Sequence, residues 1–389
     1  MYRLAYATYM LMIASAGVTF VFLEDIETDY NLPSWGIGLI SALAFAPTLA
    51  ATLLFAPLGD RGHVGLIGAA GIVLTIVGNS WIGFADELWS ISTSRGIVGV
   101  GIGMFSVAAR KALIGESTED SGQRIGTLLS AAVAGFIAGP GIGAWLAEGR
   151  GIETPYLVIA GLIAVLAGPV IWWLHTTSIA TSGHVTTRSM LPLLRRPRVR
   201  GAVACQMAIF FNIGVFDSTV DEYLTDLGAS NVQIGWILVL IGAPLIVLPT
   251  WAGRLVDRSR RPNFILFAAT AAFVPIIFSM AIWTVLSVFI ALAVIETVTE
   301  SFIFPAAARV VVDETGAEES AIGQGLLDSF GLLAGAVAAF TAPMLFDLAN
   351  GPIGSFGMST AVAAALVVFA FTQLRPSFRP WFEPSSQPV

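Results

Sequence analysis

The sequence predicts an all-α polytopic membrane protein whose twelve transmembrane helices form two parallel-repeat six-helix bundles. Three observations carry this prediction. The chain is 56% hydrophobic and 12% charged, with a mean hydropathy of +0.82, whereas soluble domains are about 25% charged. Its apolar runs have the length of about 20 residues with which a helix crosses a bilayer. Motifs of the first half of the chain also return in the second half at a nearly constant offset.

The apolar runs give the expected helices in order. They cover residues 4–23, 35–57, 65–84, 88–109, 125–147, 155–174, 202–220, 231–252, 263–283, 285–308, 321–346 and 353–373. The longest polar connection, residues 176–200, ends in a basic stretch and is interpreted as a cytoplasmic linker. The sequence therefore predicts one bundle over residues 1–175 and a second over residues 201–389, which ends in a short cytoplasmic tail.

The basic residues predict the orientation, because Arg and Lys collect on the cytoplasmic side of a membrane. With a cytoplasmic N-terminus, 17 of the 19 Lys and Arg residues fall on that side, all except Arg95 and Arg150. The loops of the other side are acidic and contain Glu24, Asp86 and Asp221. We therefore expect both termini in the cytoplasm, in a multi-pass protein of a cell membrane.

The two halves repeat one another. Asp60-Arg61 recurs as Asp257-Arg258, 197 residues later, and further matches at offsets of 197 to 199 extend over more than 100 residues. Six helices separate the copies, so both halves have the same orientation. Parallel repeats of this kind place the substrate site of a secondary transporter between the halves, near the bilayer midplane.

An uncharged stretch rich in glycine fills the fifth apolar run. Its marked residues are Gly126, Gly135, Gly139, Pro140 and Gly143. The last three glycines recur every four residues, so they share one helix face that another helix can approach closely. Proline bends a helix because it lacks an N–H and clashes with the preceding turn. The stretch predicts a helix that moves against a neighbour; static packing is the alternative interpretation.

Two loops carry an Asp-Arg motif. The loop after the second run contains Asp60-Arg61, and the loop after the eighth reads Gly253-x-Leu-x-Asp257-Arg258. They resemble the cytoplasmic Gly-x-Leu-x-Asp-Arg signature of the major facilitator superfamily, although the first copy has Ala in place of the leading Gly. Such an Asp can accept hydrogen bonds from a helix N-terminus, and the Arg can pair with an acid of the next helix. We expect a conformational latch; a tight turn with cytoplasmic basic charge is the alternative.

Two further stretches resemble motifs of the same superfamily. Arg95 and the spaced glycines that follow it are similar to its fourth-helix motif. The run from Gly126 to Gly143 resembles the fifth-helix signature that is often called the antiporter motif, and departs from it only at Ala144. The resemblance implies a secondary transporter in which the first, fourth, seventh and tenth helices line the substrate cavity.

Two acids lie inside the tenth apolar run. Glu296 is 13 residues from both Trp283 and Arg309, which places it near the midplane, and Glu300 lies one turn further on the same face. A charge there costs at least about 2.5–3.5 kcal/mol, and two neighbouring carboxylates in a low dielectric do not both ionise easily. We expect Glu296 and Glu300 to carry the coupled proton. A structural hydrogen bond to another helix is the alternative.

The candidates for the substrate cavity are Arg95, Phe211, Asn212 and Asp217. Arg95 lies about 12 Å inside Glu87 along its helix, and the repeat offset places it at a depth similar to that of Glu296. It is a partner of that acid or a packing anchor. Asp217 can meet a cationic substrate, or it is the first acid of an outer loop.

Several classes of function are excluded. The only lysine, Lys111, is followed by Ala112, so the chain has no P-loop. One cysteine and three scattered histidines predict no metal site and no cofactor. The sequence therefore predicts a transporter and not an enzyme, with an ion gradient as its source of energy.

The simplest function consistent with these features is proton-coupled antiport that expels a small amphipathic compound. Proton-coupled uptake of a nutrient is one alternative, and a non-transporting receptor or assembly factor on the same fold is another. The expected partners are a small-molecule substrate, protons and the lipid bilayer. We expect a monomer and no nucleic acid.

Overall fold

The computed structural model of the chain describes residues 1–115, 121–177, 191–259, 261–349 and 351–375. These residues contain twelve helical segments that are long and apolar enough to cross a membrane. The α-helices of the first half are α1 (Tyr2–Val18), α2 (Leu23–Asp29), α3 (Ser34–Ala42), α4 (Ala46–Asp60), α5 (Val64–Ile82), α6 (Leu88–Gly115), α7 (Ser121–Ala147) and α8 (Glu153–Thr176). Those of the second half are α10 (Pro197–Asp226), α11 (Asn231–Arg258), α12 (Pro262–Ile282), α13 (Leu286–Leu348) and α14 (Pro352–Leu374). Short 3₁₀ turns, η1 (Thr19–Val21) and η2 (Leu191–Arg195), follow α1 and precede α10.

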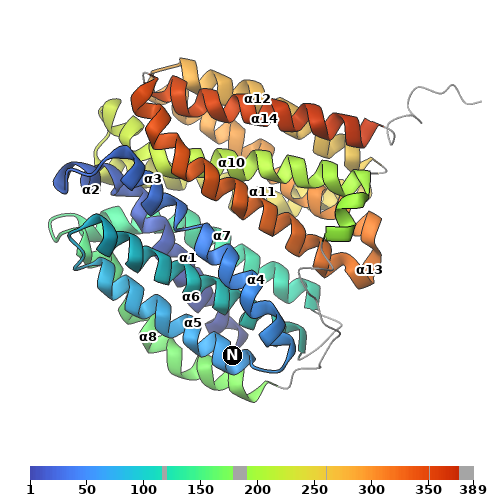
Figure 1. Cartoon of the computed structure of the whole chain (residues 1–389), viewed down its shortest axis with the longest axis horizontal. Coiled ribbons are helices and arrows are strands. Elements are labelled where there is room, and N and C mark those ends of the chain that lie inside the picture. Colours follow the sequence, from blue (N-terminus) through green and yellow to red (C-terminus); the bar gives the residue numbers. More distant parts are fainter. Residues whose placement is uncertain (116–120, 178–190, 260, 350, 376–389) are drawn as a thin grey trace, which may run out of the picture.

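The helices form two groups (Figure 1). In the first group α1 packs on α7 and α5 packs on α6 and α8; in the second, α10 packs on α13 and α14, and α12 packs on the same two helices. The third span of each half, α5 or α12, thus packs on the last span of the same half, α8 or α14, as expected of a duplicated six-helix unit. The predicted fold class, an all-α membrane protein of twelve spans, is confirmed by these elements.

The breaks between helices differ from the prediction at two places. The second span is broken into α3 and α4 at residues 43–45, and Pro47 in the first turn of α4 has no N–H to continue the helix from α3. The tenth and eleventh spans run together as α13 without a long loop, and Gly316, with φ of 73°, makes the break between them. Glycine adopts this conformation without the steric cost of a side chain.

The linker lies only partly within the described residues. Residues 178–190 of the predicted segment 176–200 fall outside them, while its last part forms η2 and the start of α10. Helix α10 therefore begins at Pro197, five residues before the predicted span. The division of the chain into two bundles and a linker stays a prediction.

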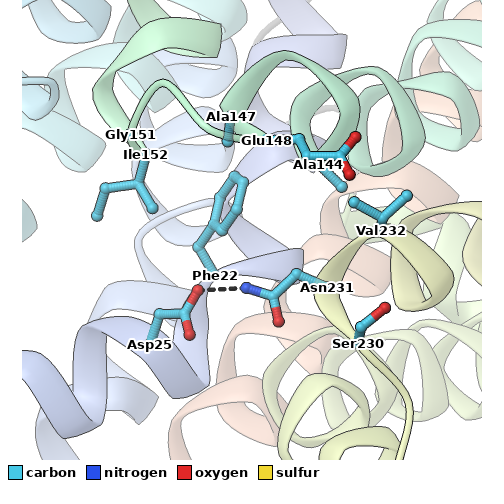
Figure 2. A pocket seen from close by; sticks show the side chains of 10 residues that line it. All are labelled: Phe22, Asp25, Ala144, Ala147, Glu148, Gly151, Ile152, Ser230, Asn231 and Val232. Atoms are coloured by element: carbon cyan, nitrogen blue, oxygen red, sulfur yellow. Dashed lines mark hydrogen bonds between the residues drawn. The ribbon is translucent and has the colours of Figure 1, made fainter.

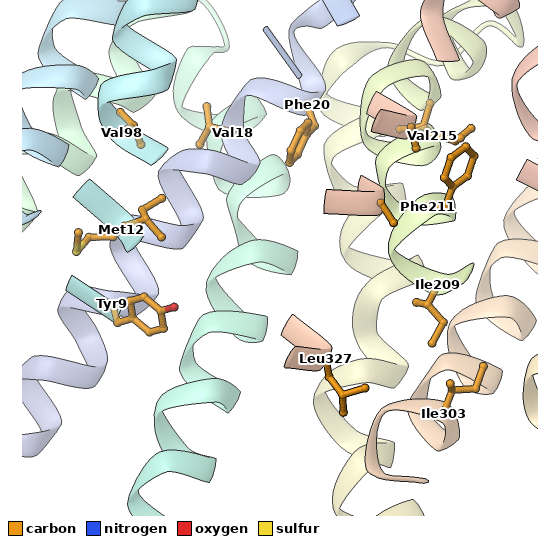
Figure 3. Close-up of a cluster of buried hydrophobic side chains, with 14 of the residues drawn as sticks. Tyr9, Met12, Val18, Phe20, Val98, Ile209, Phe211, Val215, Ile303 and Leu327 are labelled. Atoms are coloured by element: carbon orange, nitrogen blue, oxygen red, sulfur yellow. The ribbon is translucent and has the colours of Figure 1, made fainter. Parts of the chain in front are cut away.

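Large apolar side chains cover the outside of the helix bundle. Leu54, Val165 and Leu348 are 70%, 75% and 81% exposed. Exposed apolar surface on this scale is typical of a protein that faces lipid. The interior is also apolar and extends through both halves, from Met12 and Val18 on α1 to Phe211 on α10 (Figure 3).

The two halves touch mainly through two helix pairs, α7 with α11 and α3 with α13. A Cβ added at Gly235 of α11 would lie 2.9 Å from the carbonyl oxygen of Pro140, and one added at Gly38 of α3 would overlap the backbone of Phe340. Helices α2 and α3 lie at one end of the bundle (Figure 1), and Ser34 at the start of α3 contacts Asp347 of α13. We call this end the acidic end, after Glu24, Asp25, Glu27, Asp221, Glu222, Asp226 and Asp347.

Candidate functional site

Glu296 and Glu300 lie side by side inside the second half. Both project from α13, are 5% and 3% exposed, and share a side-chain hydrogen bond. Asn212 of α10 donates from Nδ2 to Oε1 of Glu296 over 3.0 Å, and the Thr297 hydroxyl donates to Oε2 over 3.3 Å. The hydrogen bond between the two carboxyl groups requires one proton that the pair shares.

Asn212 joins the acid pair to a third helix. Its Oδ1 accepts a hydrogen bond of 2.8 Å from the hydroxyl of Ser359 on α14, and both residues are 1% exposed or less. The Ser359 contact fixes which end of the amide faces Glu296, because only the Nδ2 end is left to donate. One chain of hydrogen bonds therefore links α14, α10 and α13 around the acid pair.

Arg95 projects from α6 into the first half and is 2% exposed. Its Nη1 donates to the carbonyl of Ala16 over 2.8 Å and to the hydroxyl of Thr19. Thr19 also accepts from the hydroxyl of Tyr156 over 3.1 Å, and the guanidinium carbon lies 5.1 Å from the centre of the Phe20 ring. Arg95 makes no ion pair with Glu296 in the described part of the chain, so the pairing left open by the sequence is not formed here.

Asp217 lies on α10 and is 6% exposed. Its Oδ2 has no hydrogen-bond partner, and it interacts electrostatically with Arg95 from the other half and with Glu300 from its own half. It is therefore a buried acid and not the first acid of an exposed loop. Phe211, one turn and a half earlier on the same helix, is 8% exposed and belongs to the apolar interior (Figure 3).

The acidic end joins the halves through hydrogen bonds that all use a carboxylate as acceptor. The backbone N–H of Glu24 donates to Oδ2 of Asp221 over 3.0 Å. Asn231 donates to Asp25, as the dashed line in Figure 2 marks, and Ser34 donates to Asp347. The carboxylates of both halves are thereby held near one another.

A cavity of about 460 Å³ lies at the same end, between the two halves. Phe22, Asp25, Glu148 and Asn231 are among the side chains that line it (Figure 2). Next to it, α2 carries Glu27, whose pKa is raised to about 7 by burial and by the charges of Asp347 and Glu24. Burial is also the main cause that raises the pKa values of Glu24 and Asp25.

The glycine stretch of α7 packs on α1. A Cβ added at Gly135 or Gly139 would overlap the backbone carbonyl of Met10 or Ala14, and one added at Gly143 would lie 2.9 Å from Val18. Gly126, at the start of the stretch, faces open space. Pro140 lies inside α7, and its carbonyl meets α11 of the other half. This helix thus contacts both halves within one turn of its proline.

The second Asp-Arg motif, predicted in a loop, lies instead in the last turns of α11, because the end of an apolar run does not end a helix. It lies against its own half. Asp257 is 3.5 Å from Arg309 of α13, which also pairs with Asp313 over 2.9 Å. Arg258 is exposed, and Gly253 has its nearest neighbour, Pro305, at 3.8 Å from an added Cβ.

In the first loop Arg61 is exposed, and the side chain of Asp60 lies outside the described part of the chain.

Between the halves, Arg110 of α6 pairs with Asp328 of α13 over 3.2 Å. No group of three or more His, Cys, Asp or Glu side chains in the described ranges is placed to hold a metal ion.

Sequence reasoning missed several residues of the site. Thr19, Tyr156 and Ser359 are ordinary polar residues of apolar helices, and no spacing distinguishes them. Asp221, predicted in an outer loop, lies buried in α10 and accepts from Glu24 at a separation of 197 residues, the repeat offset itself. Because every residue of the first half has an equivalent at that offset, the offset alone does not identify this contact.

Comparisons with known proteins identify the family. The model of the Major Facilitator Superfamily matches residues 5–204 and again residues 202–388. The multi-drug resistance efflux pump PmrA homolog of Lactococcus lactis subsp. lactis (strain IL1403) is 24% identical over 273 residues, 67% of each chain. The uncharacterized MFS-type transporter YcaD of Salmonella enteritidis PT4 (strain P125109) is 28% identical over 265 residues, 65% of each chain. The matches thus span about two thirds of these relatives.

Solved structures share the fold over nearly the whole chain. A bacterial homolog of the human lysosomal transporter Spinster, inward-facing and unoccupied, has a TM-score of 0.78 at 14% identity and covers 99% of this chain and 98% of its own. A D-xylose-proton symporter has a TM-score of 0.74 at 15% identity, with 95% and 96% covered. The human organic anion transporter MFSD10 has a TM-score of 0.64 at 16% identity, with 95% and 99% covered.

Proposed function

The chain belongs to the major facilitator superfamily of transporters, and we propose that it is a proton-coupled antiporter that expels a small amphipathic compound. The direction draws on the likeness to the Lactococcus lactis protein, which is named as a homolog of a multidrug efflux pump. The coupling ion draws on the buried acids. In this proposal the protein acts as a monomer in a cell membrane, with both termini in the cytoplasm.

The observation that carries the proposal is the hydrogen-bonded pair of Glu296 and Glu300, buried inside the second half without a basic partner. Two ionised carboxylates at this distance in a low dielectric repel strongly, whereas one shared proton removes the repulsion and supplies the hydrogen bond. If the transporter exposes this pair to one side of the membrane and then to the other, the pair can take up the proton on one side and release it on the other.

Coupling follows from the groups around the pair. Asn212 and Thr297 stabilise an ionised Glu296, and Asp217 adds a third carboxylate next to Glu300. A substrate that brings positive charge to these acids favours their ionised forms and releases the proton. Reprotonation then weakens binding of the substrate. By linkage, proton and substrate lower each other's affinity by the same factor.

Transport in liposomes tests the proposal. Purified protein is reconstituted with the pH dye pyranine in the lumen, and each member of a panel of cationic, anionic and zwitterionic amphiphiles is loaded inside. Exit of a transported compound acidifies the lumen in antiport and alkalinises it in symport, whichever way the protein inserts. Symport would overturn the antiport proposal. The absence of proton movement with every compound would favour the non-transporting alternative.

A variant pair tests the role of the acids. Glu296→Gln keeps the shape of the side chain but cannot ionise, so we expect proton movement to stop while passive exchange of the compound survives. Glu87→Gln makes the same chemical change at an exposed position at the start of α6, and it should behave as wild type. If Glu296→Gln still concentrates substrate against its gradient with a wild-type pH profile, the proton travels through other residues.

A further inference from the structure

Arg95 has two donor groups that no residue in the described part of the chain accepts from. Its Nη1 is occupied by Ala16 and Thr19, but Nε and Nη2 have no hydrogen-bond partner, although the residue is 2% exposed. A buried charged donor without a partner loses its hydration and gains nothing in return. These two groups are therefore free to hold an acceptor that is not part of the chain.

In the other half, Asp217 carries a buried acceptor atom to which no described residue donates. Its Oδ2 is buried without a partner, and no ion pair joins it to Arg95 among the described residues, although the two interact electrostatically. Both lie at a similar depth from the acidic end. Arg95 is seven residues from Leu88 and Asp217 is nine from Asp226, or about 10 Å and about 14 Å along their helices.

The polar groups nearby are already used. Glu296 accepts from Asn212 and Thr297, and Asn212 is bound at both ends of its amide. What is left is a pair of donors on the first half and one carboxylate oxygen on the second. Glu300 lies on the side of Asp217. Beside Arg95 stands an apolar surface, the Phe20 ring, which packs edge-on against Phe136 at 5.7 Å.

We propose that Arg95 and Asp217 bind the head group of the substrate and that the substrate is a zwitterionic amphiphile. Its carboxylate is held by Nε and Nη2 of Arg95, its ammonium by Oδ2 of Asp217, and its apolar part lies on Phe20. A simple cation would leave the donors of Arg95 unpaired, and a simple anion would leave Asp217 unpaired. The inference rests on the proposed transport function and names its substrate class.

Three fluorescent probes with the same dansyl group test the inference on the purified full-length protein in detergent. Nε-dansyl-lysine carries an ammonium and a carboxylate, dansylcadaverine carries only the ammonium, and dansylglycine carries only the carboxylate. Because a charge-assisted hydrogen bond is lost in each single-charge probe, dansyl-lysine should bind at least about tenfold more tightly than either. Equal or tighter binding of dansylcadaverine, or saturable binding of none of the three, would overturn the proposal.

Variants assign each charge to its residue. Arg95→Gln should remove the preference for dansyl-lysine over dansylcadaverine, and Asp217→Asn the preference over dansylglycine. Arg150→Gln, the same change at an exposed loop position, should leave both preferences unchanged. If Arg95→Gln fails to fold, Arg95→Lys replaces it and should keep only part of the preference. A uniform loss of affinity for all three probes would indicate a structural role and refute the assignment.

The result of this binding experiment does not depend on whether transport is coupled to protons. Binding is measured without a membrane or a pH gradient, so a failure of proton coupling in liposomes leaves its result intact. Conversely, a chain that prefers another class of probe can still move protons against its substrate. The two proposals can therefore fail separately.

Discussion

Raising the pH should loosen the contact between the halves at the acidic end, and Glu27 should be responsible for much of that effect. Glu27 lies on α2, which contacts α10 of the other half. Burial, then Asp347 and Glu24, raise its pKa from 4.5 to about 7. Glu222 of α10 also faces it with negative charge.

The sign follows from the raised pKa. The closed contact binds the proton of Glu27 more tightly than a solvated Glu27 does, so its favourable contribution is complete below pH 4.5 and is lost as the pH rises to about 7. The rise of this pKa from 4.5 to about 7 corresponds to about 3.4 kcal/mol. Since the side chain is only half-buried, solvent screening reduces this to about 1–2 kcal/mol, or a factor of about 5–30 in the closed population.

Distances between the halves measure this population. Spin labels on cysteines at Arg150 and Thr284 report on exposed loops of opposite halves, once the buried Cys205 has been replaced by Ser. In wild type the long-distance fraction should grow between pH 5 and 7. Glu27→Gln should flatten that rise, while Glu24 and Asp25 retain part of it.

Glu87→Gln serves as the matched control, because it removes an exposed acid that is not among the charges acting on Glu24, Asp25 or Glu27. It should keep the wild-type pH profile. A wild-type distance distribution that does not change from pH 5 to 8 would refute the reasoning, and so would a Glu27→Gln profile that matches wild type.

Two further predictions concern the moving parts. Gly139→Leu should lower thermal stability by about 1–3 kcal/mol and abolish transport, because the added side chain overlaps Ala14. Gly126→Leu is the control: its side chain points into open space, so thermal stability and transport should stay unchanged. Equal effects of the two substitutions would show that close packing on α1 is not required. Asp257→Asn removes the charge that pairs with Arg309 over 3.5 Å. Because exposed ion pairs contribute only about 0–1 kcal/mol, stability should not change. If the pair acts as a latch, turnover in liposomes should slow while equilibrium binding stays the same. Weaker binding with an unchanged transport rate would rule out a latch at this motif.

Local patterns in the sequence were sufficient for the helices and for some of their contacts. A span of about 20 apolar residues has one stable conformation in a bilayer, because every backbone group must be bonded within it. The four-residue spacing of Gly135, Gly139 and Gly143 likewise predicted one close-packed face, since residues at this spacing lie above one another on a helix. Glu296 and Glu300 were placed together by the same periodicity.

What the periodicity could not provide is the rotation and tilt of one helix against another. Spacing gave Arg95 and Glu296 a similar depth, but only the packing of α1 against α6 directs the guanidinium to Thr19, and only α14 brings Ser359 to Asn212. The sequence predicted an interruption at residues 309–320, but it did not show that both helices continue through that polar stretch to a single break at Gly316, because polar residues beyond an apolar run fit helix and loop alike. Depth along a helix is a local property that the sequence determines, whereas the partner across an interface depends on how twelve helices fill space together, and that was decided by the tertiary structure alone.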